Sequence, residues 1–270
     1  MPELTVSMPA YNSSKFIDEA IESVLRQEGV DFELIVVDDG SEDNTVELVR
    51  SFKDPRIRLI TNKKNMGIAY CHNVVIDESK SPFITHVDSD DLVLPGAFQK
   101  MMDMIKSSPN LGQVHCNYYV IDENGRRIKD SSRKPDMDYK RELLVRGGVM
   151  NHLRTYRKEL FDVAGKFDEN LKYSIDTEMA LRIIDKYDIK LVTESLYCRR
   201  LHKGNASQSL RFKELRFWFQ RLLFSRRLLE SKKILFPREK QYKLSRLMIL
   251  GLYCALRFKT FRNLITILRQ

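Results

Sequence analysis

The first 106 residues alternate between apolar runs and amphipathic segments, a pattern that predicts strands and helices in turn. The near-continuous apolar runs are typical of parallel strands that are covered on both faces. Strands are expected at 4–11, 32–41, 57–62 and 82–91, and helices at about 14–27, 45–52, 67–77 and 96–106. The alternation predicts an α/β fold with a Rossmann-like, mostly parallel sheet and helices on both faces.

The pattern loosens after Gln113. A further strand is expected at Gln113–Asp122, an amphipathic helix in the second half of Tyr173–Tyr187, and a last strand and polar loop within Ile189–Ser207. From about Leu210 onward the spacing indicates helices. The chain is therefore expected to divide into a domain at 1–209 and a helical extension at 210–270.

Polar or acidic clusters follow three of the first four expected strands, at Pro9–Asn12, Asp38–Ser41 and Asp88–Asp91. A solvated turn accounts for one such cluster. Three of them at one edge of one sheet predict a binding site, because ligands of open α/β sheets bind beyond the carboxyl ends of the strands.

The segment His86–Asp91 places three carboxylates in four consecutive positions. Their mutual repulsion is relieved by a divalent cation such as Mg²⁺ or Mn²⁺, which prefers hard oxygen ligands. Asp88 and Asp90 share one side of an extended chain, whereas a turn would bring Asp90 and Asp91 together. A helix cap is the alternative, above all for Asp91, and the spacing only modestly favours metal binding.

Charge is distributed unevenly over the chain, whose net charge is +9. Residues 211–270 hold 16 of the 46 Lys and Arg but only three of the 37 Asp and Glu. A basic extension of this kind predicts an acidic partner, either nucleic acid or an anionic membrane surface. Four scattered cysteines and no secretory pattern at the first residues predict a reduced, cytoplasmic chain.

Several segments, in order and spacing, resemble the nucleotide-sugar-binding half of family-two glycosyltransferases, which are inverting enzymes with the A-type glycosyltransferase fold. The resemblance runs from about Pro2 to Ser207 and is weaker for the last 60 residues. The segments are VSMPAYN, LIVVDDGSEDNT, NMGIAYCHN, HVDSDD, GKFDENL and RRLHKGNAS. The resemblance implies that 1–209 binds a nucleotide sugar and carries the catalytic site.

The resemblance assigns the base of the donor to the ends of the first two strands. Pro9, Ala10 and Tyr11 are expected to line the base pocket, with the Tyr11 ring against the nucleobase. Asp39 is expected to accept the N3–H of uracil, while Asp38 braces the turn. A carboxylate suits uracil better than cytosine, so a UDP-sugar is the expected donor.

The third signature of the family matches Asn65, Gly67 and Asn73. Gly67 permits a tight turn, and the asparagines are expected to brace the loop beside the donor. Helix capping is an equally good explanation for Asn73.

The acidic segment matches the Asp-x-Asp element formed by Asp88, Ser89 and Asp90. Asp90 is the expected metal ligand, and Asp88 faces the ribose or the waters of the metal. His202 lies in the last matching segment, where an imidazole can reach the metal or a phosphate oxygen. The implied cofactor is Mn²⁺ or Mg²⁺, and Arg199 or Arg200 is expected to add positive charge.

Asp176 is the expected general base, because it occupies the second position of a Glu-Asp pair that begins a helix in the family. Here the preceding residue is Ile175, so one of the two carboxylates is absent. The alternative is that Ser174 and Asp176 only cap the helix. Among the other histidines, only His152 is placed near the site, as a residue that could line the acceptor pocket.

The implied activity is transfer of a sugar from a UDP-sugar to a glycan or lipid-linked acceptor, in cell-envelope polysaccharide or glycolipid synthesis. The basic extension is expected either to pack on the catalytic domain or to bind an anionic membrane from its cytoplasmic face; nucleic acid has no role beside a nucleotide-sugar domain. The alternative is an inactive nucleotide-sugar-binding module, anchored by that extension. An oxidoreductase or a nucleotidyltransferase is disfavoured because the glycine-rich phosphate loops are missing. No oligomeric state is predicted.

Overall fold

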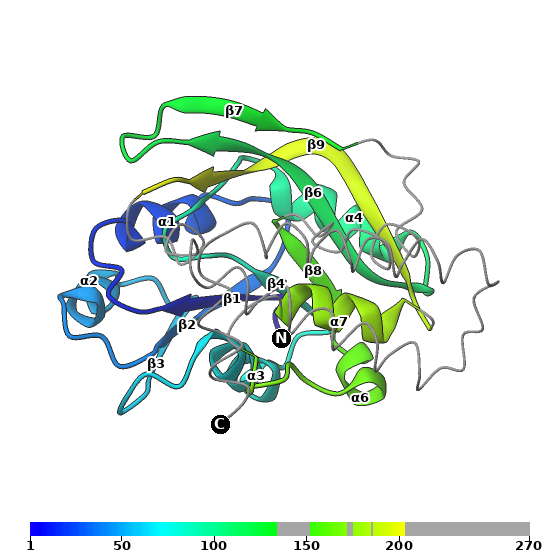
Figure 1. The fold of residues 1–270 in the computed structure, drawn as a ribbon, viewed down its shortest axis with the longest axis horizontal. Coiled ribbons are helices and arrows are strands. Elements are labelled where there is room, and N and C mark those ends of the chain that lie inside the picture. Colours follow the sequence, from blue (N-terminus) through cyan, green and yellow to red (C-terminus); the bar gives the residue numbers. More distant parts are fainter. Residues whose placement is uncertain (134–151, 172–174, 185, 203–270) are drawn as a thin grey trace, which may run out of the picture. The chain divides into compact units, whose positions relative to one another are not determined.

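A single nine-stranded sheet organises the computed structural model, which describes residues 1–133, 152–171, 175–184 and 186–202 (Figure 1). The strand order is β3-β2-β1-β4-β8-β6-β9-β5, with β7 beside β6. The strands are β1 (Leu4–Ala10), β2 (Phe32–Asp38), β3 (Ile57–Thr61), β4 (Phe83–His86), β5 (Leu92–Val93), β6 (Leu111–Ile121), β7 (Arg127–Ser131), β8 (Arg154–Arg157) and β9 (Asp188–Arg200). The expected boundary at 209 and the helical extension at 210–270 lie outside the described residues.

The first half of the sheet is parallel, as the apolar runs predict. Strand β1 pairs in parallel with both β2 and β4, and β2 pairs in parallel with β3. The register places Ala10 beside Asp38 and Ser7 beside His86, so the three strands end at the same edge of the sheet.

The second half of the sheet is mixed. Strand β8 runs antiparallel to β4 and to β6, while β6 and β9 form a long parallel pair. The expectation of an α/β sheet with helices on both faces is confirmed, and the mixed half is an addition to it. Strand β8 escapes prediction because its four residues, Arg-Thr-Tyr-Arg, contain no apolar run.

Helices cover both faces of the sheet. Figure 1 shows α3 (Ile68–Glu78), α6 (Leu160–Ala164) and α7 (Ile175–Ile183) on one side, and α1 (Ile17–Leu25) and α4 (Ala97–Lys106) on the other. The short helix α2 (Thr45–Ser51) packs beside α1. Within the described residues, no helix is both long enough and apolar enough to cross a membrane.

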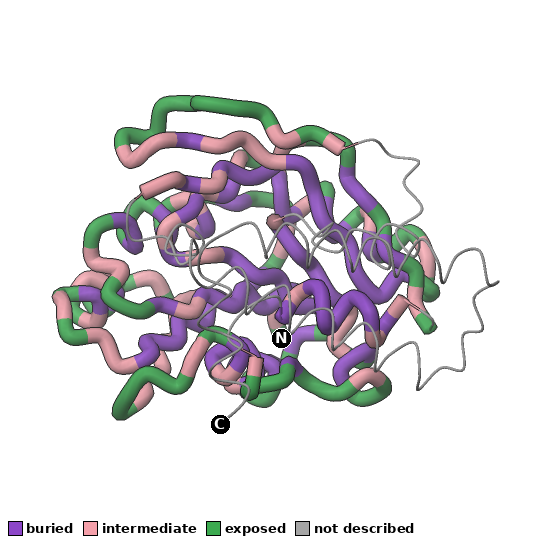
Figure 2. Tube along the Cα trace, viewed as in Figure 1, coloured by how far each residue is buried: buried purple, intermediate pink, exposed green. Residues whose placement is uncertain are grey.

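The core lies along the central strands, which Figure 2 shows as buried, whereas β7 is mostly exposed. Helix α1 contributes its apolar stripe to this core, and all four members of the stripe are fully buried. Each such aliphatic side chain, Ala apart, stabilises the fold by about 1.5–3 kcal/mol. The members are Ile17, Ala20, Ile21 and Val24.

The structure differs locally from the sequence-based expectations at the first helix and at the acidic segment. Helix α1 begins at Ile17, three residues after the expected start, and has no side-chain cap, while Asn12 adopts a left-handed backbone (φ 49°) and bonds to the turn after β2. Strand β4 ends at His86, before the acidic segment, which forms a turn. Asp91 does not cap α4, whose N-cap is Gly96; its Oδ1 instead accepts a hydrogen bond from the Arg200 backbone.

Candidate active site

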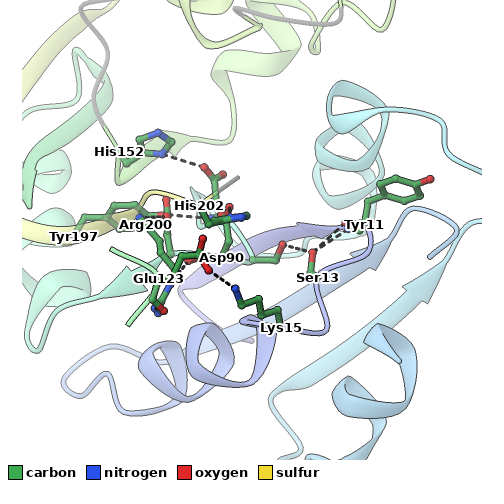
Figure 3. Close-up of polar contacts among 12 residues, drawn as sticks. Tyr11, Ser13, Lys15, Asp90, Glu123, His152, Tyr197, Arg200 and His202 are labelled. Carbon is green, nitrogen blue, oxygen red and sulfur yellow. Dashed lines mark hydrogen bonds and ion pairs between the residues drawn. The ribbon is translucent and has the colours of Figure 1, made fainter. Parts of the chain in front are cut away.

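The ends of β1, β2 and β4 converge, as the polar clusters predict. The Asp39 N–H donates to the Ala10 carbonyl at 2.8 Å, which joins the segments that follow β1 and β2. Ser13 and Ser89 share a hydrogen bond between their hydroxyls at 2.8 Å, which joins the segments that follow β1 and β4. Tyr11 is 47% exposed, and Figure 3 shows its ring pointing away from the acidic turn. This edge can therefore present an aromatic face and a group of carboxylates to one elongated ligand.

Asp39 holds the loop that follows β3. Its buried carboxylate accepts hydrogen bonds from the Asn62 side chain (2.8 Å) and from the backbone N–H groups of Met66 (2.9 Å) and Gly67 (2.8 Å). A carboxylate offers about four lone-pair sites, and this loop occupies three of those of Asp39. This loop-holding role has no signal in the sequence. Contact between Asp39 and uracil stays a prediction.

Asp38 and Gly40 form the turn after β2. The Asp38 Oδ2 accepts hydrogen bonds from the N–H groups of Gly40 and Ser41, both at 3.2 Å. Gly40 has φ +76°, and a Cβ there would lie 2.8 Å from the Lys64 backbone. Only glycine allows this turn to approach the loop that Asp39 holds.

Of the third signature, Gly67 and Asn65 lie in the loop and Asn73 lies on α3. Gly67 has φ +96° and precedes α3, as the expected tight turn requires, and Asn65 is exposed. The Asn73 amide bonds with the backbone N–H and carbonyl of Phe167, both at 2.9 Å, and donates to the Glu169 carboxylate at 2.8 Å. These bonds connect Asn73 to a distant loop, so the alternative of a helix cap does not apply, and its contact with a donor stays a prediction.

The acidic turn carries two carboxylate–imidazole pairs (Figure 3). His202 Nε2 lies 2.8 Å from Asp90 Oδ2, and His152 Nδ1 lies 3.5 Å from Asp88 Oδ2. His202 follows β9 and His152 precedes β8, so the two rings come from different strands. Asp88, Asp91 and His152 each offer one ligand atom, and these three atoms lie within 4.8 Å of one another.

Crowding shifts the pKa values of these acids. Burial raises the pKa of Asp90 and the nearby Asp88 raises it further, while the hydrogen bond with His202 opposes the shift. Burial, Asp88 and Asp90 together raise the pKa of Asp91 well above its usual value. Burial lowers the pKa of His152 to about 4, so this imidazole is neutral at pH 7 and its Nδ1 can act as a ligand.

These residues fit a divalent cation. A cation would relieve the repulsion that raises the pKa values of Asp90 and Asp91, and carboxylate oxygens are ligands that suit Mg²⁺ and Mn²⁺. The predicted ligands Asp88, Asp90 and His202 lie at this turn, and the structure adds Asp91 and His152 to the candidates.

Arg200 ties the acidic turn to the rest of the domain. Its backbone N–H donates to Asp91, its Nε to the Asp90 carbonyl at 3.0 Å, and its Nη2 to Glu19 at 2.6 Å. Its Nη1 donates to the carbonyl of Glu123, whose carboxylate pairs with Lys15 (Figure 3). With 1% exposure, the Arg200 guanidinium faces protein groups, so the expectation that Arg199 or Arg200 adds positive charge to the site stays a prediction for Arg199.

Asp176 lies in the first turn of α7, with its side chain 25% exposed. Its Oδ2 lies 2.9 Å from Nη1 of Arg154, the first residue of β8. Because α7 begins at Ile175, Asp176 is inside the helix and not at its N-cap, while Ser174 lies outside the described residues. Ile175 is buried in the core, so it offers nothing to a ligand.

Comparisons with known proteins agree with this geometry. The family model described as "Glycosyl transferase family 2" matches residues 5–165. Chondroitin synthase of Escherichia coli is 30% identical over 209 residues, covering 77% of this chain and 30% of the synthase. The succinoglycan biosynthesis protein ExoO of Rhizobium meliloti is 33% identical, covering 73% of this chain and 57% of ExoO. The chain thus spans less than a third of the length of the chondroitin synthase.

Solved structures support the fold. The structure of S. aureus TarS 1–349 in complex with UDP-GlcNAc superposes with a TM-score of 0.65 at 23% identity, covering 77% of this chain and 61% of TarS 1–349. At this identity the likeness concerns the fold, and it confirms the expected architecture.

Proposed function

The chain belongs to glycosyl transferase family 2, and from this premise we propose that it is an inverting, metal-dependent enzyme that uses a UDP-sugar. The proposed acceptor is a hydroxyl group of a glycan or lipid-linked glycan, in polysaccharide or glycolipid synthesis. The observation that carries the proposal is the meeting of Asp90–His202, Asp88–His152 and Arg154–Asp176 where β4 ends.

The donor is proposed to lie along the edge formed by β1, β2 and β4. The exposed Tyr11 ring offers a stacking surface for uracil at one end, and the acidic turn suits a metal-bound diphosphate at the other. Two solved structures of one comparison protein support this choice: TarS is described in complex with UDP-GlcNAc and with UDP.

The chemistry is proposed to divide between the acidic turn and Asp176. Asp88, Asp90 and His202 would hold a Mn²⁺ or Mg²⁺ ion, which when bound stabilises the charge that develops on the diphosphate leaving group. Asp176 would accept the proton of the acceptor hydroxyl as that oxygen attacks the anomeric carbon. Attack from the face opposite the diphosphate inverts the configuration at this carbon.

The acceptor class is proposed from the relatives, whose names include chondroitin synthase and a succinoglycan biosynthesis protein. The basic extension supports a position at the anionic, cytoplasmic surface of a membrane, because residues 211–270 hold 16 Lys and Arg. Binding of the full chain to anionic vesicles, weakened by salt and absent with neutral vesicles, tests this position.

Metal-dependent release of UDP from a panel of UDP-sugars tests the function. Asp90→Ala and Asp176→Asn should each lower the rate by at least about 100-fold, while Asp103→Asn, a matched change at an exposed residue of α4, should not. Full turnover in Asp176→Asn would remove this residue as the base. Calorimetry that detects no binding of UDP in the presence of Mn²⁺ would contradict the donor assignment.

The second candidate is an inactive nucleotide-sugar-binding module, and it rests on Ile175, which replaces a carboxylate in the family pattern. Binding of UDP without turnover of any donor, in the presence of a range of acceptors, would favour it.

A further inference from the structure

We propose that Arg154 is a positioning residue for the reaction: it holds the carboxylate of Asp176 in place beside the acidic turn. The inference rests on the proposed function of Asp176 as general base. Its structural basis is the ion pair between Arg154 Nη1 and Asp176 Oδ2, at 2.9 Å.

The sheet fixes where Arg154 stands. Strand β8 pairs with β4 so that Arg154 lies opposite His86, the last residue of β4, two positions before Asp88. The Arg154 side chain is only 9% exposed. A rigid strand therefore places a guanidinium between the acidic turn and the first turn of α7.

Arg154 carries its positive charge beside Asp176. Burial opposes the charged guanidinium, but Asp176, Tyr156 and Asp88 raise the pKa of Arg154 above its usual value, so it stays charged. Without Arg154, the Asp176 carboxylate would lose its counter-charge and the contact that restricts its rotation.

Arg157, a second arginine on β8, makes the contacts that are typical of a structural role. Arg157 donates from Nε to the Leu111 carbonyl at 3.2 Å, and from Nη2 to the carbonyls of Ile105 at 3.1 Å and Ser108 at 3.2 Å. Arg154 Nε, by contrast, is buried and has no partner among the described residues. A buried N–H without a partner destabilises a fold. The Arg154 side chain is therefore better explained by a role in the active site than by a contribution to stability.

The test compares Arg154→Met with Arg157→Met in transfer assays with a UDP-sugar and Mn²⁺. Arg154→Met should lower kcat about 100-fold, the order expected when a reacting group is misplaced, with the donor KM within about threefold of the wild-type value. Arg157→Met should lower the melting temperature but keep kcat within about threefold. Arg154→Lys keeps the charge but lacks the planar fork of arginine. Its kcat should therefore be about tenfold higher than that of Arg154→Met.

A double variant separates positioning from general damage. If Arg154 acts through Asp176, the pair Arg154→Met and Asp176→Asn should be no slower than Asp176→Asn alone. If Arg154→Met does not fold, Arg154→Lys must still show a kcat deficit of about tenfold at an unchanged donor KM.

The outcomes distinguish this inference from the proposed function. Wild-type kcat in Arg154→Met or in Arg154→Lys, or equal losses in kcat and donor binding, would overturn the role of Arg154 while leaving Asp176 in place. An additive loss in the double variant would also overturn it. Full activity of Asp176→Asn would overturn the proposed base itself.

Discussion

Asp39 shows at the scale of a single residue how one carboxylate can serve both fold and ligand. Its two oxygens accept three hydrogen bonds from the loop at 62–67, and the residue is 3% exposed. A contact with a nucleobase would be added to a carboxylate whose position the protein already fixes. Recognition of the base would then depend on the same residue as the shape of the loop.

Asp39→Asn should weaken both functions. The amide replaces one acceptor oxygen by an NH₂ group that must face N–H donors, so the free energy of unfolding should fall by about 1–3 kcal/mol. Affinity for UDP should fall at least about tenfold, the equivalent of 1.4 kcal/mol. Urea denaturation and calorimetry measure the two effects, with Asp103→Asn as the control. Unchanged stability would contradict the observed bonds, and unchanged affinity would contradict the assignment to uracil.

Predictability also differs from residue to residue. The acidic turn is visible in the sequence because its carboxylates are consecutive. His202 becomes visible only through a resemblance, since 112 positions separate it from Asp90. The Arg154–Asp176 pair has no sequence signal, because it depends on a strand register that apolar spacing does not encode.

At the scale of elements, the strands with long apolar runs are predictable and the short polar ones are not. Strands β1, β2 and β3 begin at the expected residues and end within three residues of the expected limits, because burial on both faces demands apolar side chains throughout. Strand β8 has four residues and helix α6 has five, which is too few for a period of apolar and polar positions to be recognised. The missed strand carries the residue that reaches Asp176.

The turn after β2 is an element whose geometry depends on one glycine. Gly40→Ala should destabilise the protein by about 2–5 kcal/mol, from a left-handed backbone and from overlap with the Lys64 backbone. Gly125→Ala is the matched control, because Gly125 has a similar φ of +77° but open space around its Cβ. This control should cost about 1–2 kcal/mol. Equal costs in thermal or urea denaturation would show that the close approach to Lys64 does not matter.

At the scale of the whole molecule, buried histidines make the fold sensitive to acid. Burial lowers the pKa of His72 and of His115 to about 3, and it also lowers the pKa of His86 well below its usual value. The His72 and His86 rings stack with their centroids 3.7 Å apart. Below pH 6.5 the unfolded chain binds protons at these positions while the folded chain does not, so each histidine lowers stability as the pH falls.

His115→Asn isolates one such contribution. The wild-type free energy of unfolding should fall more steeply between pH 6 and pH 4 than that of the variant, by about 1.4 kcal/mol per pH unit. The raised pKa values of Asp90 and Asp91 act in the opposite direction, but they are common to both proteins and cancel in the difference. Urea denaturation at a series of pH values gives the two slopes. Identical slopes would mean that His115 is protonated in the folded protein.

Arg200 connects groups that the chain produces far apart: Glu19 from α1, the Asp90 carbonyl, and the Glu123 carbonyl beyond β6. The hydrogen bonds to these groups cannot form until Arg200, at the end of β9, has been synthesised. During synthesis the acidic turn exists long before the Arg200 guanidinium that bonds to it, so this corner of the candidate site is completed last. A nascent chain that stops short of residue 200 would already contain the aspartates, yet it would lack the hydrogen bonds from Arg200 that fix their positions.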